Sequence, residues 1–195
     1  LTDDHRVDLP ALAAAVNDRT RLIFVCNPNN PTSTTVTDAE FAAFMASVPE
    51  DVLVALDEAY FEYNRAADTP VATDVITRYP NVVGLRTFSK AYGLAGARIG
   101  YAFGPEPIIE ALNKVAVPFS VSSIAQVAAA ASLDAGEELR RRVDETVAQR
   151  ELVAERLAAY GVPASQANFI WIPADRITEA PAALAERIAA EGVLV

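Results

Sequence analysis

The sequence contains only one cysteine, Cys26, and only one histidine, His5. A single thiol cannot form an internal disulfide, and this cysteine usage suits a reducing compartment such as the cytoplasm. Cys26 ends the apolar run LIFVC, where packing in the core is its expected role. His5 lies in the polar N-terminal segment and is expected to be a solvated surface residue. Catalysis by a histidine pair and a histidine-rich metal site are excluded, and we expect no bound metal.

Long apolar runs and an excess of positive charge are also missing. No apolar run approaches the roughly 18 residues that span a membrane, and the acidic start LTDDHRVDLP lacks the pattern of a signal peptide. The formal net charge of -10 argues against a nucleic acid partner, because phosphate binding calls for a basic surface. With 52% hydrophobic and 22% charged residues, the 195 residues have the composition of a globular protein with a sizeable core.

Apolar runs alternate with helical patterns in the first part of the chain. The expected strands are RLIFVC (21–26), buried on both faces, then VLVALDEAY (52–60), NVVGLRTFS (81–89) and RIGYAFG (98–104). A capping box formed by Thr37 and Glu40 opens a helix, and Pro105 opens another at its first turn. Strands that alternate with helices predict an α/β fold with a mostly parallel sheet.

The chain changes character after Pro118. An alanine-rich stretch predicts one shorter helix and one long helix that ends near Tyr160–Gly161. QANFIWIP (166–173) is expected to be a strand, and EAPAALAERIAAEG an amphipathic helix that closes on Gly192. We expect residues 1–119 to be part of a large domain, and residues 120–195 to be linking helices and part of a smaller α/β domain. The chain starts without Met and its end, EGVLV, reads as an interrupted strand, so a piece of a longer protein is expected.

Three polar residues follow three different strands. Asn30, Asp57 and Lys90 each lie at or just past the end of an apolar run. Ligands of parallel sheets bind beyond the carboxyl ends of the strands, so these side chains are expected to meet at one edge. Each residue alone is more commonly a turn, a cap or a solvated side chain, and the set of three is what favours a functional site.

Lys90 is the only charged residue between Arg86 and Arg98, in a stretch that reads as buried. A buried ammonium must reach water, find a counter-ion or become a neutral amine, and a neutral amine is what Schiff-base chemistry requires. Thr87, Ser89 and Arg98 flank it, and hydroxyls with an arginine make a phosphate pocket. The N-terminus of a helix expected after Lys90 would add its dipole.

Two nucleotide-binding patterns are only partly matched by the sequence. VLVALDEA also describes the Mg²⁺-binding strand of P-loop nucleotidases, but the G-x-x-x-x-G-K-[ST] loop is absent from the sequence. The glycines of GLAGARIG are spaced G-x-x-G-x-x-x-G, which is not the dinucleotide fingerprint. These glycines are expected to serve close packing of a helix on a strand.

The blocks NPNNPT, LDEAY and RTFSKAYGLAGARIGY resemble the signature blocks of fold-type I, pyridoxal-phosphate-dependent aminotransferases, in the histidinol-phosphate aminotransferase subfamily. NPNNPTST and VPFSVSSIAQ look most like the aromatic (phenylalanine) aminotransferase branch. The resemblance runs from HRVDL to ANFIWIP, and Ser33 stands where family members commonly have glycine.

The resemblance implies a role for each matching residue. Pyridoxal 5'-phosphate would be covalently bound to Lys90, with Asp57 on its pyridine nitrogen. Tyr60 and Asn30 would bond its phenolic oxygen, and Thr87, Ser89 and Arg98 its phosphate. Lys90, Asp57 and Tyr60 would be the catalytic residues, and the Asn30–Pro31 bond would be cis.

The resemblance also implies a reaction and partners. The protein would be a cytoplasmic homodimer with its active site at the dimer interface. It would transfer the amino group of phenylalanine, tyrosine or tryptophan to a 2-oxo acid such as 2-oxoglutarate, in ping-pong fashion through pyridoxamine phosphate. Histidinol phosphate is the alternative amino donor, and a non-catalytic relative that keeps the fold for binding is a third reading.

Overall fold

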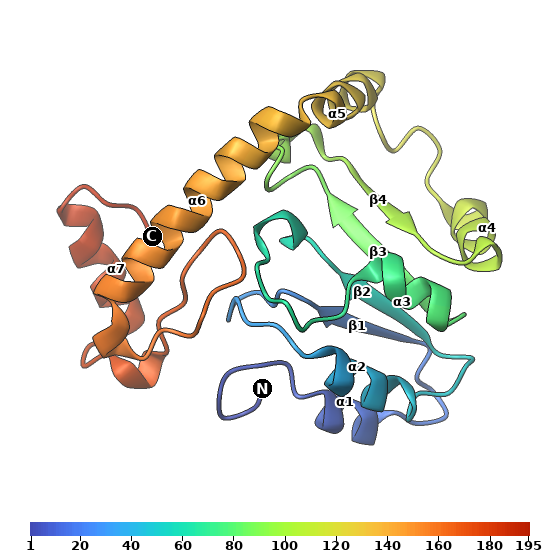
Figure 1. The fold of residues 1–195 in the computed structure, drawn as a ribbon, viewed down its shortest axis with the longest axis horizontal. Coiled ribbons are helices and arrows are strands. Elements are labelled where there is room, and N and C mark those ends of the chain that lie inside the picture. The colour runs from blue at the N-terminus through green and yellow to red at the C-terminus, as the bar shows by residue number, and fades with distance from the viewer.

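A computed structural model describes all of residues 1–195 and contains a single four-stranded sheet (Figure 1). Its strands, in spatial order, are β1 Leu22–Cys26, β2 Leu53–Asp57, β3 Val82–Thr87 and β4 Gly100–Phe103. Both β1 and β3 run parallel to β2, whereas β4 is antiparallel to β3. The predicted α/β fold with a mostly parallel sheet is confirmed.

Seven α-helices accompany the sheet. They are α1 Leu9–Ala15, α2 Asp38–Met45, α3 Ala72–Arg78, α4 Glu106–Val115, α5 Ser123–Asp134, α6 Gly136–Arg156 and α7 Pro181–Ala190. The long helix α6 runs diagonally from α5 beside the sheet to α7 at the far side of the molecule (Figure 1). None of the helices is long and apolar enough to cross a membrane.

The main hydrophobic core lies on one face of the sheet. Alternate residues of β1 and β2, among them Val25 and Val54, pack there against apolar side chains of α1, α2 and α3. Leu22 and Phe24 of β1 point to the other face and are 46% and 57% exposed. The prediction that β1 is buried on both faces is therefore wrong, because no other part of this chain covers the face that carries Leu22 and Phe24.

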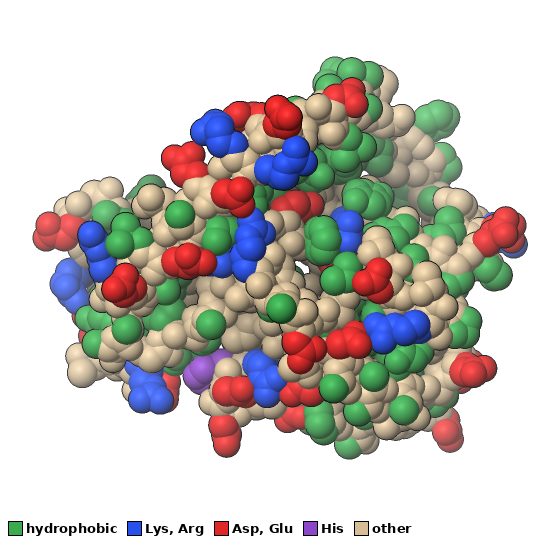
Figure 2. Space-filling view, viewed as in Figure 1, with side chains coloured by type: hydrophobic (Ala, Val, Ile, Leu, Met, Phe, Trp, Pro, Cys, Tyr) green, Lys and Arg blue, Asp and Glu red, His purple; other side chains and the backbone are tan.

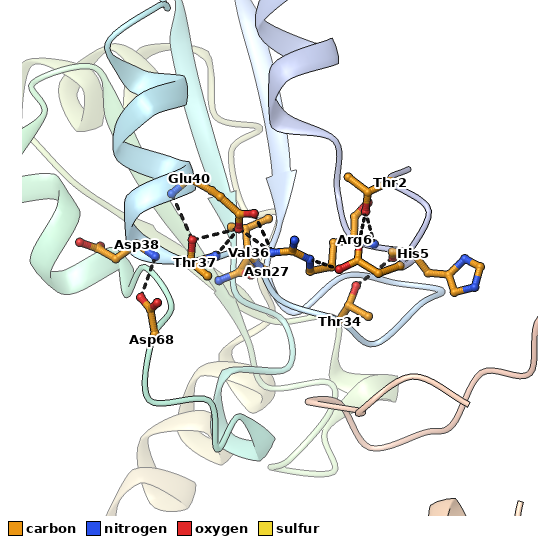
Figure 3. A network of polar contacts seen from close by, with 11 residues as sticks. Thr2, His5, Arg6, Asn27, Thr34, Val36, Thr37, Asp38, Glu40 and Asp68 are labelled. Atoms are coloured by element: carbon orange, nitrogen blue, oxygen red, sulfur yellow. Dashed lines mark hydrogen bonds and ion pairs between the residues drawn. The ribbon is translucent and has the colours of Figure 1, made fainter. Parts of the chain in front are cut away.

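The start of α2 follows the predicted capping box. The Thr37 hydroxyl accepts from the Glu40 backbone N–H at 3.1 Å, and a Glu40 carboxylate oxygen accepts from the Thr37 N–H at 2.8 Å. Arg6 donates to both oxygens of the same carboxylate at 2.7 Å, so the N-terminal segment is bound to α2 (Figure 3). A helix begins at Pro105 as predicted, with Pro105 as the N-cap of α4 and not in its first turn.

Three expectations about the ends of the chain are corrected. His5 is half-buried, because its ring packs edge-to-face on Trp171 with the centroids 4.7 Å apart. Residues 166–173 and 191–195 do not form strands. A strand needs a neighbouring strand to bond to, and residues 166–173 instead bond to a turn and to side chains.

The predicted helices of the last 75 residues are present. Helices α5 and α6 are the expected shorter and longer helices, and the short 3-10 helix Ala158–Tyr160 ends on Gly161 in a left-handed conformation with φ 64°. Helix α7 is followed by Gly192 with φ 85°, where glycine meets no steric penalty.

Acidic side chains are spread over the face of the molecule shown in Figure 2, in keeping with the net charge of -10.

A second, smaller core joins α6 to the rest of the chain. Val143 and Val147 of α6 pack there with Tyr60, Tyr63 and Ala91, and the Phe169 ring lies against them. Tyr60 belongs to this cluster, and Lys90 directly precedes Ala91 in the chain. The middle of α6 therefore packs next to two of the predicted site residues.

Candidate active site

A cavity of about 620 Å³ opens where β2 and β3 end, and five of the predicted site residues line it. They are Asp57, Thr87, Ser89, Lys90 and Arg98. The parallel register pairs Asp57 with Leu85, so the two strands end at the same edge of the sheet. Side chains alternate along a strand, so Asp57, Leu85 and Thr87 share the face that points away from the main core.

Asn30 and Tyr60 complete the predicted set beside this cavity. The Asn30 side-chain amide donates to the Tyr60 hydroxyl at 3.0 Å. The Lys90 Nζ lies 5.1 Å from the centroid of the Tyr60 ring, within the range of a cation–π interaction. The Asn30–Pro31 bond is cis, as predicted, and so is Asn27–Pro28. Tyr60 therefore links Asn30 to Lys90, which brings three separate segments of the chain together beside the cavity.

Lys90 itself is exposed, which corrects the expectation of a buried amine. Its side chain leaves the turn after β3 and reaches the open cavity, where its amino group is accessible to solvent. No other side chain of the protein forms a hydrogen bond or an ion pair with it. The amine is accessible to a carbonyl compound that enters the cavity.

Asp57 provides a partly buried negative charge in the same cavity. One oxygen, Oδ1, accepts from the Ala59 backbone N–H at 3.0 Å, and Oδ2 accepts no hydrogen bond within the chain. Burial raises the pKa of Asp57, and the bond from Ala59 opposes this rise. A buried carboxylate without a cation is suited to hold a protonated nitrogen.

Burial also raises the pKa of the Cys26 thiol, and the charge of Asp57 on the neighbouring strand adds to this rise. A raised pKa suits a packing role for Cys26 better than that of a nucleophile.

Two hydroxyls and an arginine also line the cavity. The Thr87 hydroxyl accepts from the Ser89 backbone N–H at 3.0 Å, which ties the Thr87 side chain to the backbone of the turn. Arg98 is exposed and uses only one donor within the chain, to the Ala95 carbonyl oxygen at 2.7 Å. The remaining guanidinium donors and both hydroxyls can bind the oxygens of an anion.

The segment after Lys90 differs from the expected helix. It forms turns and the short 3-10 helix Ala95–Ala97, so a helix dipole does not contribute to the site. The glycines here serve the backbone and not the packing of a helix. Gly93 has φ 72°, and a Cβ on Gly100 would lie 2.8 Å from the Arg86 carbonyl oxygen on β3. The close approach of β4 to β3 depends on this last glycine.

Sequence reasoning missed a buried ion pair next to the site. Arg86 Nε donates to Glu58 Oε2 at 2.7 Å, and the two side chains are 14% and 2% exposed. The guanidinium also stacks on the Phe61 ring, 3.7 Å from its centroid. Glu58 directly follows Asp57, so strand alternation points it to the opposite face, where a carboxylate needs a cation. That alternation was the available signal.

Ser33 occupies the turn position where the resemblance expects glycine. Its φ is 60°, in the left-handed region that costs a side chain about 1 kcal/mol. The residue is buried, its hydroxyl donates to the Thr32 carbonyl oxygen at 2.6 Å, and its own carbonyl accepts from the Gln166 N–H at 2.7 Å. The serine therefore keeps the turn geometry that glycine would adopt more easily.

The sequence matches the family described as aminotransferase class I and II over residues 1–195, and the chain belongs to this family. Among its curated relatives, an aromatic amino acid aminotransferase of Corynebacterium glutamicum strain R is 61% identical over 186 residues, which are 95% of this chain and 54% of that protein. One of Mycobacterium bovis is 58% identical over 172 residues, 87% of this chain and 49% of that protein.

Solved structures show the same fold. The histidinol-phosphate aminotransferase of Sinorhizobium meliloti, in complex with pyridoxal-5'-phosphate, matches with a TM-score of 0.84 and 34% identity, over 99% of this chain and 53% of that one. The aspartate aminotransferase of Thermus thermophilus with maleate matches with a TM-score of 0.78 and 26% identity, over 98% and 52%. The predicted aminotransferase fold is confirmed, and the chain spans about half the length of the curated relatives that it matches.

Proposed function

We propose that the full-length protein containing this chain is a pyridoxal-phosphate-dependent aminotransferase for aromatic L-amino acids. Phenylalanine, tyrosine and tryptophan would be its amino donors, and a 2-oxo acid such as 2-oxoglutarate its acceptor. The observation that carries this proposal is the meeting of Lys90, Asp57 and three anion-binding side chains in one cavity. The names of the relatives that are about 60% identical support the choice of donor.

The donor set fits pyridoxal 5'-phosphate. Thr87, Ser89 and Arg98 have free donors for its phosphate, and Asp57 Oδ2 has no partner within the chain and could accept from its protonated pyridine nitrogen. Tyr60 and Asn30 would donate to its phenolic oxygen, and the accessible amine of Lys90 would bind it covalently. These seven residues are the proposed site, and the catalytic ones are Lys90, Asp57 and Tyr60.

The chemistry follows from what each residue can do. When bound, pyridoxal phosphate supplies an electron sink for the pair left at the substrate Cα. Lys90, as a free amine, would act as the general base that takes the proton from the substrate Cα and as the acid that passes it on. Asp57 holds the proton on the pyridine nitrogen, because its negative charge opposes the loss of that proton. Tyr60 and Asn30 fix the orientation of the ring.

Histidinol phosphate is the second candidate donor. The observation in its favour is the match to a histidinol-phosphate aminotransferase structure with a TM-score of 0.84. We also propose a homodimer with the active site at the interface, as the resemblance implies, and a cytoplasmic location, which the single thiol Cys26 suits.

Reduction with borohydride tests the covalent link. In the full-length protein loaded with pyridoxal phosphate, we expect the reduced cofactor to be recovered on the peptide that contains Lys90. The chain offers a matched control, because its only other lysine, Lys114, lies exposed on α4. Lys90→Arg should abolish labelling of this chain and Lys114→Arg should leave it unchanged. Cofactor recovered on a different lysine refutes the assignment.

A comparison of amino donors tests the substrate. We expect kcat/KM of the full-length protein to be at least about tenfold higher for phenylalanine than for histidinol phosphate, a difference of about 1.4 kcal/mol in transition-state binding. The physical reason is that an aromatic side chain requires an apolar pocket, whereas a phosphate requires several cationic donors. A higher kcat/KM for histidinol phosphate would favour the second candidate.

A further inference from the structure

Helix α6 bonds to the main chain at two points beside the site. Arg142 Nη2 donates to the Ala91 carbonyl oxygen at 3.0 Å, and Ala91 directly follows Lys90. Arg150 Nη1 donates to the carbonyl oxygens of Tyr63 and Ala167, at 3.1 and 3.0 Å. Arg150 is only 7% exposed, and these carbonyls are its hydrogen-bond acceptors. Two arginines about 12 Å apart along one helix thus contact the main chain next to Lys90 and near Tyr60.

The contacts of Arg150 lead directly to Tyr60. The Tyr63 backbone N–H donates to the Tyr60 carbonyl oxygen at 3.0 Å, inside the 3-10 helix Phe61–Tyr63. On the other side, Ala167 lies two residues before Phe169, whose ring packs edge-to-face on Tyr60 with the centroids 5.3 Å apart. The carbonyl groups that Arg150 holds therefore belong to the two segments that fix the Tyr60 ring.

The segment around Ala167 is fastened at further points. The Ser165 hydroxyl donates to the Phe169 carbonyl oxygen at 2.7 Å, and the Gln166 N–H donates to the Ser33 carbonyl at 2.7 Å. Ser33 belongs to the turn that carries Asn30, the hydrogen-bond donor to Tyr60. The position of Tyr60 thus depends on contacts with residues more than 100 positions later in the chain.

We propose that Arg142 and Arg150 are positioning residues of the proposed active site, which hold the main chain at Lys90 and at Tyr60 to one helix and so fix the Lys90 amine over the Tyr60 ring. The inference rests on the proposed function. Neither arginine touches the cavity. Their effect is on the geometry of the site. Loss of the hydrogen bonds between Arg150 and its two carbonyl acceptors would let the 3-10 helix Phe61–Tyr63 and the segment of Phe169 shift together.

The test uses Arg150→Met, Arg150→Lys and the control Arg141→Met in the full-length protein loaded with pyridoxal phosphate. Arg141 lies on the same helix with its side chain 64% exposed, so the control removes the same charge without a buried contact. The readouts are the pH midpoint of the visible absorption of the lysine-bound cofactor, the cofactor dissociation constant and the midpoint of thermal unfolding. The spectral midpoint reports the hydrogen bonds at the phenolic oxygen, which a purely structural role would not change.

We expect Arg150→Met to raise the spectral midpoint by about one pH unit, the effect of losing one hydrogen bond to a charged oxygen, and to weaken cofactor binding about tenfold. Arg150→Lys can still donate to a carbonyl and should recover most of both effects, and Arg141→Met should match the parent protein. An unchanged midpoint in folded Arg150→Met overturns the proposal.

If Arg150→Met does not fold, the spectral midpoint is measured on Arg142→Met. Arg142 is exposed on α6, so its loss leaves the smaller core packed and removes the contact with the main chain next to Lys90. An upward midpoint supports the proposal and an unchanged one overturns it. A parent protein without a lysine-bound cofactor spectrum would refute the proposed function itself, which separates the two outcomes.

Discussion

Replacement of Asp57 by asparagine is expected to lower the rate of transamination of the full-length protein on the order of a thousandfold, since an uncompensated buried charge is worth about 3–5 kcal/mol. Asparagine has the same size and keeps an oxygen for the Ala59 N–H, so the fold should not change. What is lost is the negative charge that keeps the pyridine nitrogen protonated. The measurement is kcat with phenylalanine as donor, together with the dissociation constant of the cofactor.

The matched control for this prediction is Asp51→Asn. Asp51 is exposed and precedes β2 at the opposite end from Asp57, so its replacement removes the same charge far from the cavity. We expect its kcat to equal that of the parent protein. Because the proposed phosphate ligands remain in Asp57→Asn, cofactor binding should weaken much less than kcat falls. A kcat within about threefold of the parent value corresponds to a loss of less than about 0.7 kcal/mol in transition-state stabilisation. That result would refute the role of Asp57.

The parts of the fold that the sequence predicted correctly are those fixed by local interactions. A short apolar run between polar turns predicts a strand, and the Thr37–Glu40 capping box needs only the four residues that form it. The site residues follow the same logic, because parallel strands carry Asp57 and Thr87 to one edge of the sheet. Their residue types predicted a phosphate pocket beside a reactive amine, and the resemblance of the motifs added the individual contacts to the cofactor.

The parts that the sequence did not predict depend on contacts between distant segments. Arg150 finds its acceptors 87 and 17 residues away, at Tyr63 and Ala167. Residues 166–173 have the composition of a strand, but the sheet has no place for them and their backbone bonds elsewhere. The exposure of Lys90 was missed for the same reason, since small neighbours in the sequence do not report an open cavity in space.

The buried pair Glu58–Arg86 leads to the second large expected effect, on stability. Arg86→Met should lower the free energy of unfolding by about 3–5 kcal/mol, because it leaves a buried carboxylate without its cation. Methionine fills much of the volume between Phe61 and Phe103 that the guanidinium occupies. The remaining hydrogen bond, from the Ala72 N–H to Glu58 Oε1 at 2.6 Å, cannot compensate for the charge.

The pH dependence of this loss separates charge from packing. Burial raises the pKa of Glu58, while the Ala72 N–H and Arg86 lower it, so the pKa must rise further once Arg86 is gone. A carboxyl whose pKa is raised by folding contributes stability that is present at low pH and lost as the pH rises through the folded pKa. Glu62 shifts in the same direction, because burial raises its pKa and the Arg86 charge opposes the rise.

The deficit of Arg86→Met, measured by urea unfolding of the full-length protein, should therefore be largest near pH 8 and shrink toward pH 5, where Glu58 can take up a proton. The double variant Arg86→Met, Glu58→Gln carries no charge at either position and still offers Ala72 an acceptor. We expect it to be more stable than Arg86→Met at pH 8, with a deficit that changes little between pH 8 and pH 5. An equal deficit for Arg86→Met at both pH values would mean that Arg86 acts by packing on Phe61, and that Glu58 is neutral in the folded protein.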